Sequence, residues 1–146
     1  MKKEIDPRMH SAEHILNQTM VRIFNCNRSF DAHIEKKKSK CDYHFDHALT
    51  EQEINAIEKQ VNEVIRGDMP VTEEYLTREA SQRQYNLERL PHEASDQIRI
   101  VKIGDYDACP CIGPHVTSTN EIGTFKIASA SYEDGVLRVR FKLAQL

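Results

Sequence analysis

Two short motifs, far apart in the sequence, most constrain how this chain can fold. The first is H-S-A-E-H, from His10 to His14, and the second is C-I-G-P-H, from Cys111 to His115. Residues four apart on a helix lie on one face, so the rings of His10 and His14 can point at a common site. A thiolate and imidazoles are the ligands that zinc prefers. The two motifs together predict a Zn²⁺ site with four ligands: His10, His14, Cys111 and His115.

Other interpretations of these motifs remain open. H-S-A-E-H also fits the H-x-x-E-H motif of inverted zinc peptidases, in which Glu13 would be the general base. The peptidase interpretation is disfavoured because the best downstream ligands are a cysteine and a histidine, not a carboxylate, and because the chain is short for an enzyme with a peptide cleft. Cys109 competes with Cys111 for the thiolate position. The two histidines by themselves could also be polar residues on a solvated helix.

Length and composition indicate an ordinary soluble protein. The chain has 146 residues, of which 39% are hydrophobic and 29% charged, and we expect a single domain over residues 1–146. No apolar run is long enough to cross a bilayer and the N-terminus lacks an apolar signal core, so we expect a cytoplasmic protein with no membrane partner. The net charge of −3 argues against coating DNA or other nucleic acid by bulk electrostatics but allows a local basic patch.

The pattern of apolar residues predicts three helices. Residues 7–24 start with a proline suited to a first turn, and Ile15, Leu16, Met20, Ile23 and Phe24 form one buried stripe. Residues 50–67 have a Thr50–Glu53 capping box and a terminal glycine. A shorter helix is expected over residues 78–87.

Alternating apolar residues predict strands over 41–48, 69–77, 97–103, 122–132 and 136–143, with an irregular loop between 103 and 122. Asp134-Gly135 joins the last two strands in a hairpin. In the final strand Arg138, Arg140 and Lys142 face away from the apolar side. The expected fold is therefore α+β: a two-layer sandwich of an antiparallel sheet with helices packed on one face.

Three segments, in this order, resemble the editing domain of alanyl-tRNA synthetase and its free-standing AlaX relatives: residues 10–17, 44–65 and 98–127. The editing domain of threonyl-tRNA synthetase is similar too. The resemblance extends from about residue 9 to residue 143, and no synthetase catalytic domain accompanies it, so it implies a short, stand-alone editing protein. The resemblance also implies that the positions of the family's metal ligands correspond to His10, His14, Cys111 and His115.

The resemblance implies a trans-editing deacylase whose partner is the acceptor end of a mischarged tRNA. Such a protein hydrolyses the ester of serine or glycine on tRNA for alanine. An alanine pocket cannot strongly reject a smaller amino acid or one with an added hydroxyl, so a second site must remove the error.

The sequence departs from the family pattern at several points. The loop reads C-I-G-P-H where alanyl relatives commonly have C-G-G-T-H, and its G-P-H ending is closer to the threonyl type. Seryl-tRNA for threonine is therefore an alternative substrate, and a non-catalytic zinc-clipped module that binds tRNA or protein is another alternative. Asn120 replaces a family glycine; because asparagine tolerates a left-handed backbone, we expect the turn to be retained.

Roles beyond the metal ligands are less constrained. Glu13 is a candidate for moving the proton during hydrolysis, and its alternative is an exposed helix glutamate. Four protein ligands normally form a closed structural zinc site, so a catalytic and a structural metal are both open. The segment E-K-K-K-S-K is expected to form a loop whose lysines contact tRNA phosphates: Lys36, Lys37, Lys38 and Lys40.

Overall fold

A computed structural model of the chain describes residues 5–85 and 97–144, and it confirms the α+β class. The strands form two antiparallel sheets where the sequence predicted one: a four-stranded sheet in the order β1-β2-β7-β6 and a three-stranded sheet in the order β3-β4-β5. The elements in chain order are α1 (Pro7–Phe24), β1 (Asp31–His33), β2 (Ser39–His44), α2 (Glu51–Arg66), β3 (Val71–Thr77), α3 (Arg78–Gln84), β4 (Gln97–Ile103), β5 (Asp107–Pro110), η1 (Thr119–Glu121), β6 (Thr124–Glu133) and β7 (Val136–Ala144).

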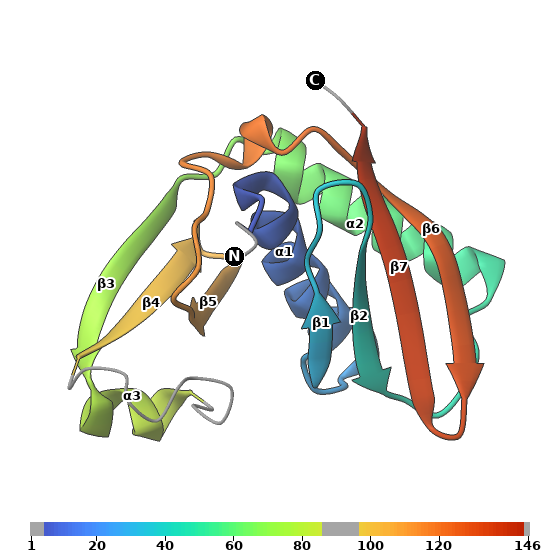
Figure 1. Cartoon of the computed structure of the whole chain (residues 1–146), viewed down its shortest axis with the longest axis horizontal. Helices are drawn as coiled ribbons and strands as arrows, with labels where there is room; N and C mark the ends of the chain where they lie inside the picture. Colours follow the sequence, from blue (N-terminus) through green and yellow to red (C-terminus); the bar gives the residue numbers. More distant parts are fainter. Residues whose placement is uncertain (1–4, 86–96, 145–146) are drawn as a thin grey trace.

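The two sheets lie on either side of α1, and α2 packs against one face of the four-stranded sheet (Figure 1). The apolar residues of α2 meet alternate residues of β7 in one core. Asn62 joins α2 to β6, because its side chain donates to the carbonyl of Phe125 at 3.0 Å and accepts from the amide of Phe125 at 2.8 Å. The predicted capping box of Thr50 and Glu53 is present at the start of α2.

Helix α1 is buried on more than one face, because the second sheet covers the side that a two-layer fold would leave in water. Asp6 caps its start by accepting from the amides of Arg8 and Met9. Thr19 Oγ1 lies 2.7 Å from the hydroxyl of Tyr106, which follows β4. The assignment of Ile23 to the buried stripe is wrong: its side chain is 38% exposed. Among the helices of residues 5–85 and 97–144, none has the length and apolar character needed to cross a bilayer.

The segment predicted as an irregular loop contains a strand, β5, that pairs with β4 at the edge of the smaller sheet. Pro110 made this segment look unlike a strand, because proline cannot donate a backbone hydrogen bond. An edge strand tolerates proline, because the outward side of an edge strand needs no hydrogen bond. Asn120 lies in the short helix η1, so the expected left-handed turn at this residue is wrong. Gly123 has the positive φ instead, at 94°.

The predicted β6–β7 hairpin is confirmed. Asp134 and Gly135 have positive φ values of 50° and 80°, which suit a tight hairpin turn. Alternate residues of β7 are buried from Leu137 to Phe141, and the basic residues between them face outward.

Candidate metal centre

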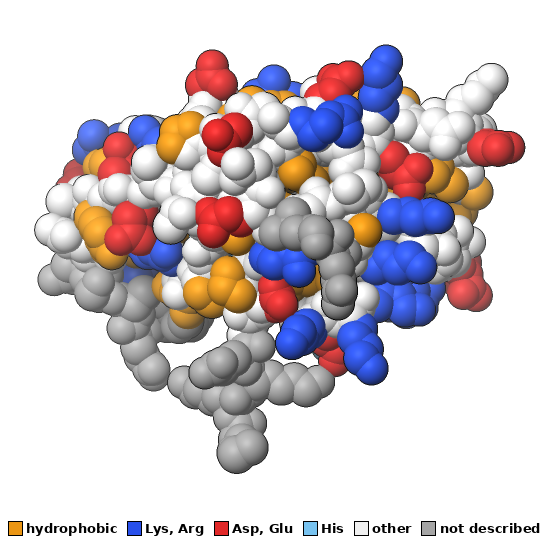
Figure 2. Space-filling model, turned by 90° about the horizontal axis from the view of Figure 1, so that it is seen from above, with side chains coloured by type: hydrophobic (Ala, Val, Ile, Leu, Met, Phe, Trp, Pro, Cys, Tyr) orange, Lys and Arg blue, Asp and Glu red, His pale blue; other side chains and the backbone are white. Residues whose placement is uncertain are grey.

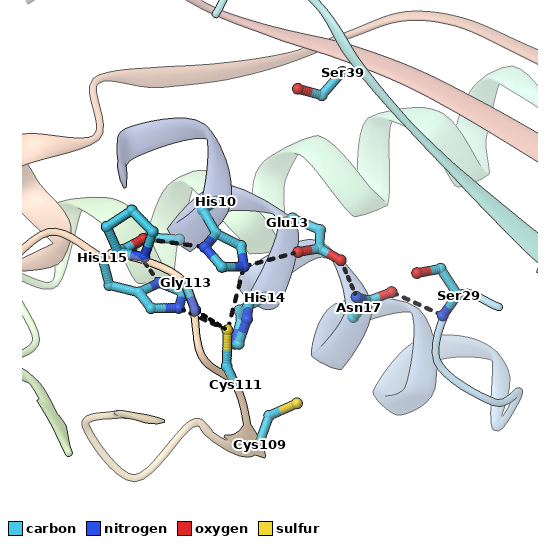
Figure 3. A network of polar contacts seen from close by, with 12 residues as sticks. His10, Glu13, His14, Asn17, Ser29, Ser39, Cys109, Cys111, Gly113 and His115 are labelled. Atoms are coloured by element: carbon cyan, nitrogen blue, oxygen red, sulfur yellow. Dashed lines mark hydrogen bonds and ion pairs between the residues drawn. The ribbon is translucent and has the colours of Figure 1, made fainter. Parts of the chain in front are cut away.

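Helix α1 and the loop after β5 bring together the four predicted ligands. The ligand atoms of His10, His14, Cys111 and His115 all lie within 4.8 Å of one another. Figure 3 shows the four side chains converging from the two segments. Because the first turns of α1 lie between the two sheets, both of its histidines are buried. This group could hold a metal ion.

The histidine rings are held from behind by protein groups. His10 Nδ1 donates to the carbonyl of Pro114 at 3.0 Å, and His115 Nδ1 lies 2.9 Å from Ser11 Oγ. Their Nε2 atoms face the Cys111 sulfur, at 3.3 and 3.5 Å. Histidines that bind metals are typically oriented through the second ring nitrogen in this way.

The third ring, that of His14, has a buried Nδ1 with no hydrogen-bond partner. This atom lies 3.7 Å from Oδ2 of Asp107, which is beyond hydrogen-bond distance. Asp107 also accepts from Arg28 at 2.7 and 3.3 Å. Burial raises the pKa of Asp107, but His14 and Arg28 outweigh burial and lower it, so a buried carboxylate stands behind the His14 ring. Nothing in the sequence pattern pointed to Arg28 or Asp107.

The electrostatics of the cluster favour a thiolate beside a protonated His14 and a neutral His115. Burial lowers the pKa of His14, but the interactions with Asp107 and with the Cys111 sulfur outweigh burial and raise this pKa to about 9. Burial raises the pKa of the Cys111 thiol, but hydrogen bonds with His10, His115 and His14 outweigh it and lower the pKa to about 3. Burial lowers the pKa of His115 to about 4. A thiolate with imidazoles is the donor set that Zn²⁺ prefers, and a bound ion would displace the proton from His14, so the residues present fit this metal.

Cys109 lies outside the cluster. Its thiol donates to the carbonyl of Pro110 at 3.4 Å, and Figure 3 shows its sulfur apart from the four converging side chains. Burial raises its pKa to about 11, so this thiol stays protonated. Of the two cysteines, the structure brings Cys111 to the histidines.

Gly113 within the loop and Arg99 on β4 hold the loop in place. Gly113 packs against the His10 ring so closely that a Cβ atom would lie 2.3 Å from Cε1 of that ring. Arg99 on β4 donates to the carbonyls of Cys111 at 3.2 Å and Gly113 at 2.7 Å. The glycine inside C-I-G-P-H could have indicated this close packing from the sequence. No sequence pattern could have indicated Arg99, because its contact depends on how β4 lies against the loop.

Glu13 is buried beside the cluster, so its interpretation as an exposed helix glutamate is wrong. Its side chain is 8% exposed, and Oε1 lies 3.7 Å from Nε2 of His10. Oε2 accepts from the amide of Asn17 at 3.3 Å, and Asn17 accepts from the backbone of Ser29 at 3.0 Å. Figure 3 shows this chain of contacts running away from the cluster. Glu13 is therefore oriented by Asn17 next to a candidate ligand.

The predicted lysine loop is only partly a loop. Lys36, Lys37 and Lys38 are exposed between β1 and β2, whereas Lys40 lies within β2. Lys40 donates to Asp31 at 3.0 Å and to Asp42 at 2.6 Å. The placement of Lys40 on a loop is therefore wrong, and two carboxylates already offset its charge.

Comparison with known proteins gives one family. Residues 98–140 match the family described as "Threonyl and Alanyl tRNA synthetase second additional domain". The chain is 33% identical over 141 residues to the alanine–tRNA ligase of Fervidobacterium nodosum, which is 95% of this chain and 16% of that enzyme. It is 29% identical over 138 residues to the enzyme of Methanopyrus kandleri, covering 92% of this chain and 15% of the relative.

A third relative, the alanine–tRNA ligase of Rickettsia prowazekii, is 34% identical over 123 residues, which is 84% of this chain and 14% of the relative. The chain thus spans only about a sixth of the length of these curated relatives, while the relatives cover most of the chain. The family match and these relatives together show that the chain is a protein of the alanyl-tRNA synthetase editing-domain type.

Proposed function

We propose that this protein is a zinc-dependent aminoacyl-tRNA deacylase that hydrolyses the ester of serine or glycine on tRNA for alanine. One observation carries the proposal: a buried cluster of three imidazoles and a thiolate, in a chain related over most of its length to alanine–tRNA ligases. Enzymes that select alanine need a second site to remove amino acids that their pocket cannot reject.

In this proposal His10, His14, Cys111 and His115 hold the Zn²⁺. A bound zinc ion supplies Lewis-acid chemistry, which stabilises the negative charge that develops on an ester oxygen during hydrolysis. The carbonyl of Pro114 and the hydroxyl of Ser11 orient two of the rings from behind. The sulfur stays deprotonated because the imidazoles surround it.

Glu13 moves the proton in this mechanism. Its carboxylate accepts a proton from the attacking water as the oxygen bonds to the acyl carbon, and returns it to the ribose oxygen as the ester bond breaks. The proposal is supported by the burial of Glu13, by its contact of 3.7 Å with His10 and by the amide of Asn17 that orients it. The peptidase alternative is weakened because the cluster contains no carboxylate ligand among the described residues.

A second substrate is favoured by one feature of the loop. The Gly113-Pro114-His115 ending is closer to the threonyl type than to the alanyl type, and the description of the matching family names both synthetases. We therefore include seryl-tRNA for threonine as a candidate. In both cases the exposed Lys36, Lys37 and Lys38 are proposed to contact tRNA phosphates. Because the proposed substrate serves translation, we also propose a cytoplasmic location, which cell fractionation tests.

The deciding experiment incubates the zinc-loaded protein with seryl-, glycyl- and alanyl-tRNA for alanine and with seryl-tRNA for threonine. We expect serine or glycine to be released and alanine to be retained. Cys111→Ser and Glu13→Gln should abolish release, whereas the matched control Cys109→Ser should retain it.

Other results would replace the proposal. No release from any of these tRNAs with zinc measured in the protein would favour a non-catalytic module in which zinc is a structural clip. Cleavage of peptides that is lost in Glu13→Gln would favour a metallopeptidase.

A further inference from the structure

The outer face of the four-stranded sheet carries basic side chains that the metal centre does not use. Lys126 lies on β6, and Arg140 and Lys142 lie on β7; we call these three residues the basic patch. Neighbouring residues on the same strands, such as Phe125 and Phe141, are buried on the opposite side against the core. Figure 2 shows Lys and Arg side chains gathered on the side of the molecule that the four-stranded sheet occupies in Figure 1.

The basic patch differs from other charges on this face because nothing in the described ranges offsets it. Arg138 donates to Asp42 at 2.8 and 3.0 Å, and Lys40 is paired with two carboxylates. Within residues 5–85 and 97–144, Lys126, Arg140 and Lys142 form no ion pair. Their charge is therefore available to a partner.

The strand register places like charges directly opposite each other. Lys126 faces Lys142 across β6 and β7, and Arg140 faces Lys40 across β7 and β2. Like charges in directly opposed positions destabilise a sheet. Asp31 and Asp42 intersperse negative charge around Lys40 and Arg138, whereas no carboxylate of the described ranges pairs with the basic patch. This concentration of positive charge, on a chain of net charge −3, indicates an anionic partner.

The basic patch reaches the end of the molecule at which the metal centre lies. Arg8, in the first turn of α1, donates to the carbonyl of Ala144 at 3.0 Å and to the carbonyl of Ile122 at 2.7 Å. These bonds attach the end of β7 to the helix turn that carries His10. Lys142 precedes Ala144 by two residues, so the basic patch ends close to the turn of α1 that carries His10.

We propose that the basic patch binds the phosphate backbone of an RNA duplex. This inference rests on the proposed function, because it assigns the patch to the acceptor arm of the tRNA whose ester enters the metal centre. Phosphate contacts fix the orientation of a nucleic acid without reading its sequence. A sheet face with separate cationic side chains suits that task.

The test compares Lys126→Gln/Lys142→Gln with Lys59→Gln/Arg66→Gln, which removes the same charge from exposed positions on α2. The probe is an uncharged transcript of tRNA for alanine, titrated at several salt concentrations. We expect the patch variant to bind more weakly and the slope of log K against log salt to shrink by about 1.4–1.8, because each lost phosphate contact removes about 0.7–0.9. The α2 variant should behave like the unmodified protein.

Four further measurements separate the outcomes: zinc content, unfolding temperature, vesicle binding and the kinetics of aminoacyl-tRNA hydrolysis. Zinc content and the unfolding temperature of the patch variant should not fall, because the substitutions remove a repulsion. Equal salt slopes for the two variants would overturn the inference, and so would patch-dependent binding to phosphatidylserine vesicles without RNA binding. If no aminoacyl-tRNA is hydrolysed but the patch variant still loses RNA affinity, the proposed function fails and the RNA surface stands. If hydrolysis occurs, the loss should appear in KM rather than in kcat.

Discussion

Replacing Gly113 with alanine tests how tightly the loop packs on His10. Gly113 does not have a positive φ, so alanine fits its backbone and any effect comes from the added methyl group. That methyl carbon would lie 2.3 Å from Cε1 and 2.7 Å from Nδ1 of the His10 ring, where real Cβ atoms essentially never come closer than 3.0 Å. To regain ordinary contact at 3.4 Å, the ring and the loop must separate by about 1 Å.

A shift of this size is large for a metal ligand. Ligand distances in metal sites hold to about 0.2 Å, so a displacement of about 1 Å takes His10 out of coordination range unless the loop moves with it. It also strains the hydrogen bond of 3.0 Å between His10 Nδ1 and the Pro114 carbonyl. Losing such an orienting partner typically costs about 10–100-fold in metal affinity, and we expect a loss at least this large, about 1.4–2.7 kcal/mol.

The assay is a Zn²⁺ titration in competition with a chromophoric chelator, together with thermal unfolding of the metal-free protein. Overpacking should also lower the stability of the metal-free protein by about 1–3 kcal/mol. Gly67→Ala is the matched control, because Gly67 has a φ of −69° and a Cβ there meets its nearest atom at 3.3 Å. Zinc affinity of Gly113→Ala within about twofold of the unmodified protein would refute the packing argument.

Three other perturbations follow from buried or bridging charges. The hydrogen bond from Arg138 lowers the pKa of Asp42 from 3.8 to about 2, so this carboxylate stabilises the fold above pH 4 and the contribution is lost as the pH falls toward 2. Asp42→Asn should therefore lower the free energy of unfolding at pH 7 by about 1–2 kcal/mol, a range that allows for solvent screening of Arg138. It should also reduce the loss of stability to urea between pH 4 and pH 2, and an unchanged loss over that range would contradict the prediction. Arg28→Met leaves Asp107 buried without its ion pair and should cost about 3–5 kcal/mol in urea unfolding at pH 7, whereas a cost below about 1 kcal/mol would show that the pair is dispensable. Arg99→Met frees two carbonyls of the metal loop and should speed hydrogen exchange of the loop amides without altering those of α2; equal exchange rates would rule out Arg99 as the anchor.

The elements that the sequence predicted best are those whose signals are local. Helix α1 has the predicted bounds because Asp6 and Pro7 suit its start, and the Thr50–Glu53 box marks the start of α2. The Asp134-Gly135 turn set the β6–β7 hairpin in the same way. These features depend on residues within a few positions of each other, so periodicity and capping are enough to find them.

The division into two sheets could not be predicted from those signals. Because of Pro110, the sequence did not predict β5: proline is tolerated mainly in strands at the edge of a sheet. Whether a strand lies at an edge is known only from the assembled sheet. The exposure of Ile23 has the same origin, because an apolar stripe shows which residues can be buried and not which neighbours cover them.

For the candidate metal centre, the sequence alone determined the ligand types and their spacing in two motifs, because four-residue spacings on a helix or in a tight loop are local geometry. Only the tertiary structure decided that the motifs meet, that Cys111 and not Cys109 joins the histidines, and that Glu13 is buried beside them. It also decided that Arg28, Asp107 and Arg99 support the cluster from other elements. These relations are through-space contacts between elements far apart in the chain, set by how the two sheets pack around α1, and no local pattern encodes them.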